Sequence, residues 1–197
     1  MPKVSEEHRT ARRTEIAGAA LRCFARKGFQ ATSMADIIAE SGLSAGAIYG
    51  HYKSKEQLIE LAIADVLDGR FLDLADARRH QPIPDPGAVV GMLVHGIEGQ
   101  IGTLSLLVQV WGQVVVDPKL HPLMSSIGTR VRTMLTAYLT DWYATALGHD
   151  PEKAAELAAR YAPLYVGIVQ GYVVQSTIFA DFDRSAYLAA ASGIRPS

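Results

Sequence analysis

Residues 33–55 combine small, hydroxyl-bearing and aromatic side chains at spacings that suit contact with a polyanion. Tyr49 and His51 project hydrogen-bond donors, and Lys55 lies at the start of a predicted helix, where phosphate binding is favoured. The residues before and between them have little or no side chain and would let the backbone approach a partner closely: Ser44, Ala45, Gly46, Ala47 and Gly50. This pattern indicates contact with a nucleic-acid backbone.

The elements that must position these side chains are two short helices joined by a turn. The apolar spacing predicts one helix over about 33–40, which Ser41 and Gly42 end, and a second helix from Ser44 to about Tyr52. Neither helix is long enough to be stable alone in water, so both must pack against each other and against a first helix, predicted over about 9–27. This arrangement is a helix-turn-helix, whose second helix enters the major groove of DNA.

Residues 16–59 resemble the DNA-binding domain of TetR-family transcriptional regulators. The resemblance rests on many positions at fixed spacing, in the KGF-x-A-T-S junction and the GLSxGxIYxHYxSKExL segment. It implies an all-helical homodimer with an N-terminal DNA-binding domain and a C-terminal domain that binds a ligand and dimerises. It implies that Ser33, Tyr49, His51 and Lys55 contact phosphates. It also implies that Ser44, Ala45 and Gly46 face base edges or the DNA backbone. The predicted DNA-binding residues are Thr32, Ser33, Ser44, Ala45, Gly46, Tyr49, His51 and Lys55.

Two positions depart from the family pattern. Position 45, often polar or basic in relatives, is Ala, and so is position 35, which is sometimes a base-reading Arg. Because the chain also contains no Asn, the side chains that usually read guanine or adenine in two hydrogen bonds are missing from the second helix. We expect specificity to come from contact with thymine methyl groups, from DNA shape, and from Arg9, Arg12 or Arg13 in an N-terminal arm.

Composition limits the class of protein. The chain has 197 residues, of which 49% are hydrophobic and 20% charged, so it is too apolar for a disordered chain. A single Cys excludes a disulfide framework and a cysteine-based metal site, and neither a metal nor a cofactor is expected. No stretch is long and apolar enough to span a bilayer, and the polar start is unlike a secretory signal. We expect a soluble, cytoplasmic protein without membrane contact.

The net charge of −1 conceals an asymmetry between the ends of the chain. Residues 1–55 carry nine Lys or Arg against five acidic side chains, and residues 56–197 carry ten against fifteen. A basic segment joined to an acidic body is expected where only one end meets DNA. We therefore expect a DNA-binding domain over 1–55 and a ligand-sensing and dimerisation domain over 56–197.

The second domain also shows only helical periodicity, which predicts an all-α fold. A linking helix is expected from Ser54 to about Arg79, followed by a proline-rich loop over 80–86. Pro163 is expected to bend the helix that contains it. The further predicted helices cover 87–101, 103–116, 119–147, 151–180 and 183–193.

The helix predicted over 151–180 is apolar nearly all round. One apolar face suffices for the core, so the other is expected to form a two-fold interface with a second copy, joined by the last helix. The predicted interface residues are Leu164, Ile168, Gly171, Tyr172 and Tyr187.

A ligand cavity is expected between the helices of 87–180, separate from the DNA-binding surface. Few charged residues fall within these helices, so the ligand is expected to be apolar or aromatic, with a cationic group allowed. The same aromatic side chains could instead fill the core, and Gln109 could face either solvent or the cavity. The candidate lining residues are Met92, Trp111, Tyr138, Trp142, Tyr161 and Tyr165.

The function that these observations favour is a ligand-responsive transcriptional regulator, acting as a repressor. Its expected partners are a double-stranded DNA operator, a small-molecule effector and a second copy of the chain. One alternative is a helical protein–protein adaptor with a degenerate helix-turn-helix, which the sparse base-reading side chains motivate. Another alternative is an all-α enzyme, which is disfavoured because no phosphate-binding loop, paired carboxylates or metal-ligand spacing is found.

Overall fold

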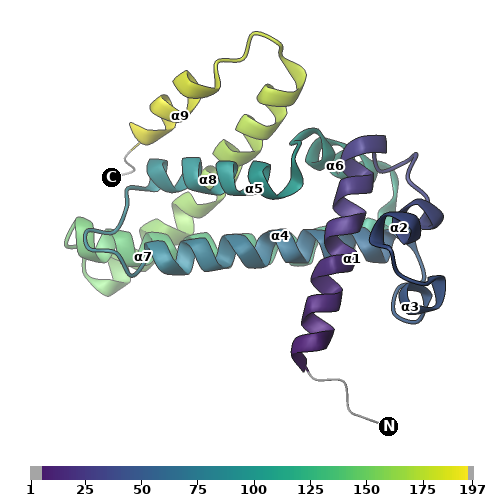
Figure 1. Cartoon of the computed structure of the whole chain (residues 1–197). Helices are drawn as coiled ribbons and strands as arrows, with labels where there is room; N and C mark the ends of the chain where they lie inside the picture. The colour runs from purple at the N-terminus through teal and green to yellow at the C-terminus, as the bar shows by residue number, and fades with distance from the viewer. Residues whose placement is uncertain (1–5, 195–197) are drawn as a thin grey trace.

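The computed structural model describes the backbone of residues 6–194 and the side chains of residues 10–194. Within that range the structure contains helices and no strand, which confirms the predicted all-α fold (Figure 1). The helices are α1 (Glu6–Lys27), α2 (Met34–Ser41), α3 (Ala45–Tyr49), α4 (Lys55–Ala77), α5 (Pro86–Ile101), α6 (Ser105–Val116), the 3-10 turn η1 (Pro118–Leu120), α7 (His121–Ala146), α8 (Pro151–Ile178) and α9 (Arg184–Ser192).

The observed helix bounds agree with the predicted ones to within a few residues, with two differences. Helix α3 ends at Tyr49 rather than near Tyr52, because Gly50 and the residues after it form a turn. The segment predicted as one helix over 119–147 begins as a 3-10 turn, with Pro118 in its first position. Helix α8 contains Pro163 and continues through it.

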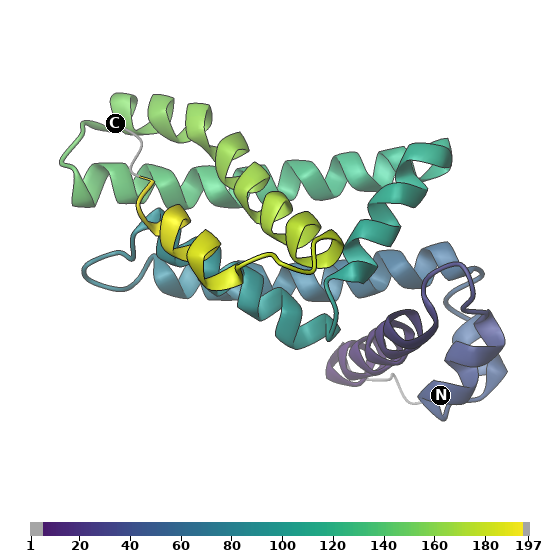
Figure 2. The same cartoon turned by 90° about the horizontal axis from the view of Figure 1, so that it is seen from above.

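Helix α4 joins the two parts of the molecule. It packs against α1 near its start and against α5 and α7 further along. Helices α1 to α3 form a separate group at one end of α4, and α7 and α8 lie side by side in the larger group (Figure 2). Helix α9 folds back over α5 and α8. The predicted domain boundary at residue 55 therefore lies at the first residue of the helix that both parts share.

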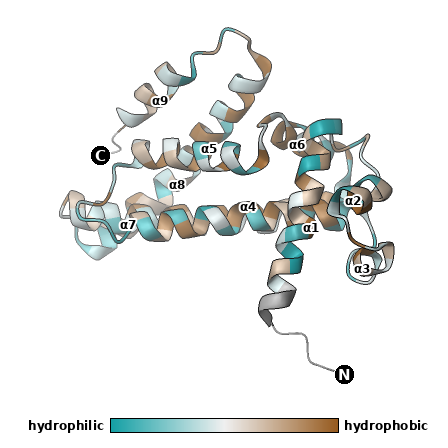
Figure 3. Cartoon of the chain, viewed as in Figure 1, coloured by the Kyte–Doolittle hydropathy of each residue, from teal (hydrophilic) through white to brown (hydrophobic). Residues whose placement is uncertain are grey.

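One continuous hydrophobic core runs through both parts. It extends from α1 through α4 and α5 to α7 and α8. Figure 3 shows apolar residues concentrated on α5 and α6, whereas hydrophilic residues interrupt α1 and α4. At the end of α7 and α8 that lies far from α1, large aromatic side chains are almost fully buried; these are Tyr138, Trp142, Tyr143 and Tyr165.

Over residues 6–194, no single helix is long and apolar enough to cross a membrane. The pair α5 and α6 reaches that length and composition only when both are taken together, and it is bent by 90° at its break. Within the described residues, no cluster of His, Cys, Asp and Glu side chains could hold a metal ion.

Candidate DNA-binding surface and ligand pocket

Hydrogen bonds at the helix ends hold α2 and α3 in place. The Ser33 hydroxyl accepts a hydrogen bond from the Asp36 amide at 3.1 Å, and Asp36 Oδ2 accepts one from the Ser33 amide at 2.9 Å. This capping box satisfies donors that the first turn of a helix leaves without partners. Gly42 has a φ of 67° in the turn, and Ser44 Oγ accepts from the Ala47 amide at 3.2 Å. Local bonds therefore define where α2 ends and α3 begins.

Ion pairs fasten α2 to α1. Lys27 Nζ lies 2.6 Å from Asp36 Oδ1, and Glu40 accepts from Arg22 at 2.7 Å and from Arg26 at 2.9 Å. The Lys27 ammonium and the capping bonds hold the pKa of Asp36 well below its usual range, and the two guanidinium groups lower the pKa of Glu40. Three basic side chains of residues 1–55 are thus already paired with the acids of α2, which reduces the charge left for DNA.

Helix α3 presents a nearly bare outer face. Ile48 is fully buried beneath it, whereas Tyr49 and His51 are exposed. A Cβ atom added to Gly46 would meet nothing within 4 Å. The predicted DNA-binding residues that lie exposed on α3 or next to α2 and α3 are Ser33, Ser44, Ala45, Gly46, Tyr49 and His51. A flat backbone of this kind can approach another surface closely.

Thr32 requires a correction. Its side chain is only 3% exposed, and its hydroxyl donates to the Gly28 carbonyl at 2.7 Å, with the Cys23 carbonyl at 3.2 Å. The hydroxyl thus bonds to the end of α1 and does not reach the surface. Thr32 stabilises the α1–α2 turn and is removed from the DNA-binding set.

Lys55 lies in the same turn. Its ammonium donates to the Phe29 carbonyl at 2.8 Å and to the Gln30 carbonyl at 3.1 Å, and it lies 4.6 Å from the centre of the Phe29 ring. The predicted phosphate contact would have to replace or share these bonds. The exposed Lys53, whose ammonium bonds to the Tyr49 carbonyl at the end of α3, is a basic side chain that the sequence interpretation overlooked.

The predicted N-terminal arm lies mostly within α1. Arg12 and Arg13 are exposed on this helix, and Arg12 pairs with Glu15 at 2.8 Å. The side chain of Arg9 lies outside the described residues. Arg13 makes no ion pair among the contacts that the structure describes, so it is the more available of the two described arginines.

Gln109 connects the two parts of the molecule. Gln109 is exposed, which agrees with the solvent-facing alternative, and it does not line the cavity; its Oε1 accepts a hydrogen bond from the Phe29 amide at 3.1 Å. Gly28 has a φ of 80°, and a Cβ atom there would lie 2.9 Å from Gln109 Oε1. Helix α6 therefore contacts the same turn that Lys55 holds from the other side.

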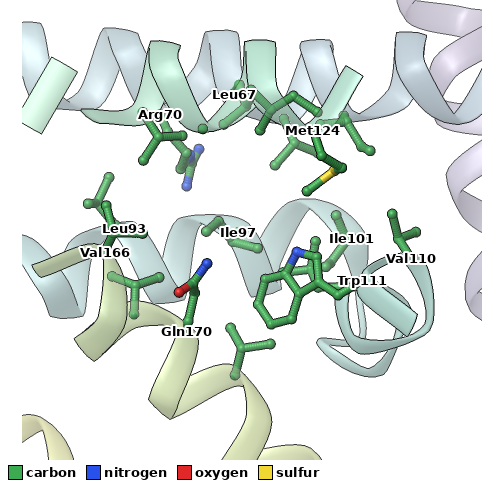
Figure 4. Close-up of a pocket in the computed structure, with 18 of the residues that line it drawn as sticks. Leu67, Arg70, Leu93, Ile97, Ile101, Val110, Trp111, Met124, Val166 and Gln170 are labelled. Atoms are coloured by element: carbon green, nitrogen blue, oxygen red, sulfur yellow. The ribbon is translucent and has the colours of Figure 1, made fainter. Parts of the chain in front are cut away.

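A cavity of about 260 Å³ lies among α4, α5, α6, α7 and α8 (Figure 4), and Leu21 of α1 also lines it. Its walls are mainly aliphatic, with Trp111, Met124 and Met134 among them. The polar lining residues are Arg70 from α4 and Gln170 from α8.

Most of the predicted lining residues require a correction, because only Trp111 borders this cavity. Tyr138, Trp142 and Tyr165 are no more than 2% exposed at the far end of α7 and α8. The hydroxyl of Tyr138 donates to the Pro84 carbonyl, and that of Tyr165 to the Ile194 carbonyl. Burial raises the pKa of both tyrosines, which therefore stay neutral parts of the core. Met92 and Tyr161 pack at the margin of the core.

The predicted dimer residues also require a correction. Ile168 and Tyr172 are buried within the protomer, and Tyr187 of α9 donates to the Ile168 carbonyl at 2.8 Å. A Cβ atom on Gly171 would lie 2.7 Å from the Tyr187 hydroxyl. Helix α9 thus covers this face of α8. Of the predicted set, Leu164 remains on the surface, 47% exposed.

Two short helices, joined by a tight turn and braced by a third, define a helix-turn-helix protein. Residues 16–62 match the family model described as bacterial regulatory proteins, tetR family. This match covers the helix-turn-helix and the start of α4, and it is over these residues that the chain is similar to TetR-family regulators.

Curated relatives agree with this assignment over part of their length. The chain is 39% identical over 82 residues to the uncharacterized HTH-type transcriptional regulator YfiR of Bacillus subtilis. The matched region covers 42% of this chain and 40% of that relative. It is 30% identical over 120 residues to the HTH-type transcriptional regulator TtgR of Pseudomonas putida, which covers 60% of this chain and 50% of the relative. The chain thus matches half or less of the length of these relatives.

Solved structures share the fold over nearly the whole chain. A TetR-family transcriptional regulator of Syntrophomonas wolfei superimposes with a TM-score of 0.72 at 15% identity, covering 93% of this chain and 92% of that one. At this identity the likeness concerns the fold alone.

Proposed function

We propose that the chain is a transcriptional repressor that binds operator DNA as a homodimer and responds to a small molecule in the α4–α8 cavity. The observation that carries the proposal is the exposed, nearly bare face of α3 on a helix-turn-helix whose ends are fixed by caps and ion pairs. The names of relatives support it, since one at 40% identity over 68 residues, from Mycolicibacterium smegmatis, is called an HTH-type transcriptional repressor.

Helix α3 would lie in the major groove with its backbone close to the bases. The exposed Ala45 and Ala47 offer methyl groups to thymine, and Tyr49 and His51 offer donors to phosphates. Without bidentate side chains on this helix, the shape of the DNA would contribute much of the specificity.

Two copies would be needed to read two half-sites, whose recognition helices lie about 34–36 Å apart in helix-turn-helix dimers. The part of α8 that α9 leaves exposed offers an interface. Leu164 and Ile178 are exposed on it, and Gly167, which lies between them, has no atom within 4 Å of an added Cβ. A two-fold interface of this kind places the same apolar stripe of each copy against the other.

The position of the cavity supports a response of the DNA-binding part to an occupant. Its walls include α4, which carries the end of the helix-turn-helix, and α6, whose Gln109 holds the Phe29 amide. An occupant that prefers one arrangement of these helices would change DNA affinity by its difference in binding free energy, typically about 1–3 kcal/mol.

The test is fluorescence anisotropy of the full chain with labelled DNA from the region upstream of its own gene. We expect affinity to fall steeply with salt, because released counterions drive binding to phosphates. His51→Gln should weaken binding to all sequences, whereas the same change at His95, another exposed histidine, on α5, should not. Absence of any complex at low salt would instead favour the adaptor function.

Light scattering tests the assembly separately. Leu164→Glu should convert a dimer to a monomer, while Leu72→Glu, a change at a leucine 72% exposed on α4, should leave the dimer intact. A wild-type monomer at micromolar concentration would contradict recognition of two half-sites.

A further inference from the structure

The cavity contains one charged group in an otherwise apolar lining. Arg70 extends from α4 into it, and its side chain is only 12% exposed. Among the described lining residues it is the only ionisable one. Arg70 continues the apolar stripe of α4 formed by Ile59, Ile63 and Val66, so a guanidinium occupies a position where the helix otherwise places aliphatic side chains.

The guanidinium is only partly satisfied. Its Nη2 lies 3.1 Å from Asp73 Oδ2, on the half-exposed side of α4. Its Nε and Nη1 are buried and have no hydrogen-bond partner. A buried donor without a partner is costly, and more so on a charged group. An acceptor in the cavity would relieve this cost if the guanidinium turned toward it, because both nitrogens are covered and Nη1 lies against Gly96.

Gly96 on α5 makes room for the charged end. A Cβ atom added there would lie 1.2 Å from Arg70 Nη1 and 2.3 Å from its Cζ. Glycine inside a helix is less favourable than alanine. The facing helix α5 therefore contains a residue that weakens the helix but leaves space for the guanidinium of Arg70.

We propose that the cavity binds a monocarboxylate with an apolar body, its carboxylate against Arg70 and its tail toward Trp111. This proposal rests on the proposed function, in which the cavity is the effector site. Figure 4 shows Arg70 and Gln170 directed into the cavity at one side, and Trp111 and Met124 at the other. The Gln170 amide supplies a second donor near the head group, and the aliphatic walls between the two sides accommodate the tail.

An anion fits better than a neutral or a cationic head. Hydrogen bonds between charged partners are roughly twice as strong as neutral ones, and the single pair with Asp73 leaves two nitrogens free. A cation would meet a like charge in a poorly solvated cavity. We therefore expect no cationic group on the ligand, although the sequence alone allowed one.

The test is isothermal titration calorimetry of the full chain without DNA, using matched ligands below their micellar concentrations. Decanoate and 4-butylbenzoate are each compared with their methyl esters, and decylamine serves as the cation. We expect at least one acid to bind about tenfold or more tightly than its ester, and the amine to bind most weakly. If neither acid exceeds its ester, the proposal is overturned.

Two variants examine the anchor itself. Arg70→Gln removes the charge, and Gly96→Ala keeps the charge but displaces the guanidinium, so each should abolish the preference for acid over ester. Gly99→Ala on the same helix, where a Cβ atom meets nothing within 4 Å, should retain it. If Arg70→Gln does not fold, the comparison of Gly96→Ala with Gly99→Ala still tests the proposal. An unchanged preference in both Arg70→Gln and Gly96→Ala would make Arg70 a purely structural residue and refute the proposal.

Anisotropy with DNA then separates this inference from the proposed function. Decanoate that binds but leaves DNA affinity unchanged would keep the carboxylate site and remove its effector role. DNA binding that is intact in a chain without any preference for acids would remove the carboxylate site and keep the regulator.

Discussion

The helix-turn-helix and the cavity-bearing helices are held together by different means. Around α2, hydrogen-bonded caps and ion pairs to α1 fix helices that are too short to be stable alone. Around the cavity, aliphatic packing encloses a space at which two nitrogens of Arg70 lack hydrogen-bond partners. The first region is therefore built for a constant shape, and the second has an unsatisfied interior that a ligand can complete.

The larger part of the molecule itself contains two contrasting ends. Trp142 is 2% exposed in the aromatic cluster, where its ring lies 5.2 Å from that of Tyr143. Burial raises the pKa of Tyr143 to about 12, as expected in a tightly packed, dry environment. Trp111, in contrast, is half-buried at the wall of the cavity. One tryptophan supports the fold and the other borders empty space.

The largest expected effect follows from this contrast. Trp142→Ala should lower the free energy of unfolding by about 3–5 kcal/mol, because it removes a large side chain from a packed core. Trp111→Ala should cost clearly less, since its ring already borders a cavity, but it should weaken ligand binding. Urea denaturation followed by circular dichroism measures both, and equal losses would contradict the division into a packed end and a cavity end.

The helix-turn-helix was the part of the molecule most fully predictable from sequence. Its helices are bounded by local signals, such as Ser33, Gly42 and Ser44, that act within a few residues. The sequence could not show which basic residues remain free to contact DNA, because Arg22 and Arg26 form ion pairs with Glu40 on a different helix.

The cavity and the dimer face were predicted poorly, and for tertiary reasons. Large aromatic side chains such as Trp142 fill the core where helices meet closely, so the cavity is bordered mainly by aliphatic ones. Helix α8 does have a second apolar face, but α9 of the same chain covers part of it, around Ile168 and Gly171. One signal in the sequence could have located the cavity, because Arg70 places a charge on the apolar stripe of α4.

An intermediate effect is expected where the two regions meet. Gln109→Ala removes the acceptor of the Phe29 amide and should lower the free energy of unfolding by about 1 kcal/mol, as for a typical hydrogen bond. It should also reduce the change in DNA affinity that a cavity ligand causes, since α6 would no longer hold the α1–α2 turn. Chemical denaturation and anisotropy measure the two effects.

Gln113→Ala is the matched control, one turn further along α6, where the described contacts include no side-chain hydrogen bond. It should change neither quantity. A Gln109→Ala chain whose response to ligand equals that of the wild type would show that α4 alone connects the cavity with the helix-turn-helix.

The smallest expected effect concerns pH. The Lys27 ammonium and two bonds from Ser33 place the pKa of Asp36 below its unfolded value of about 3.9. The stability this gives is fully present above that value and is lost as the pH falls toward the folded pKa. The thermal midpoint should therefore fall as the pH is lowered below about 4, and Asp36→Asn should make that fall shallower. Glu156→Gln is the comparison on α8, because Lys153 and Arg160 also lower the pKa of Glu156, but from within the same helix. Since Asp36 accepts more hydrogen bonds and its partner Lys27 lies on another helix, its replacement should flatten the pH profile more than that of Glu156. Equal flattening by both variants, measured by circular dichroism at low salt, would mean that the ion pairs between α1 and α2 do not distinguish this region from the rest.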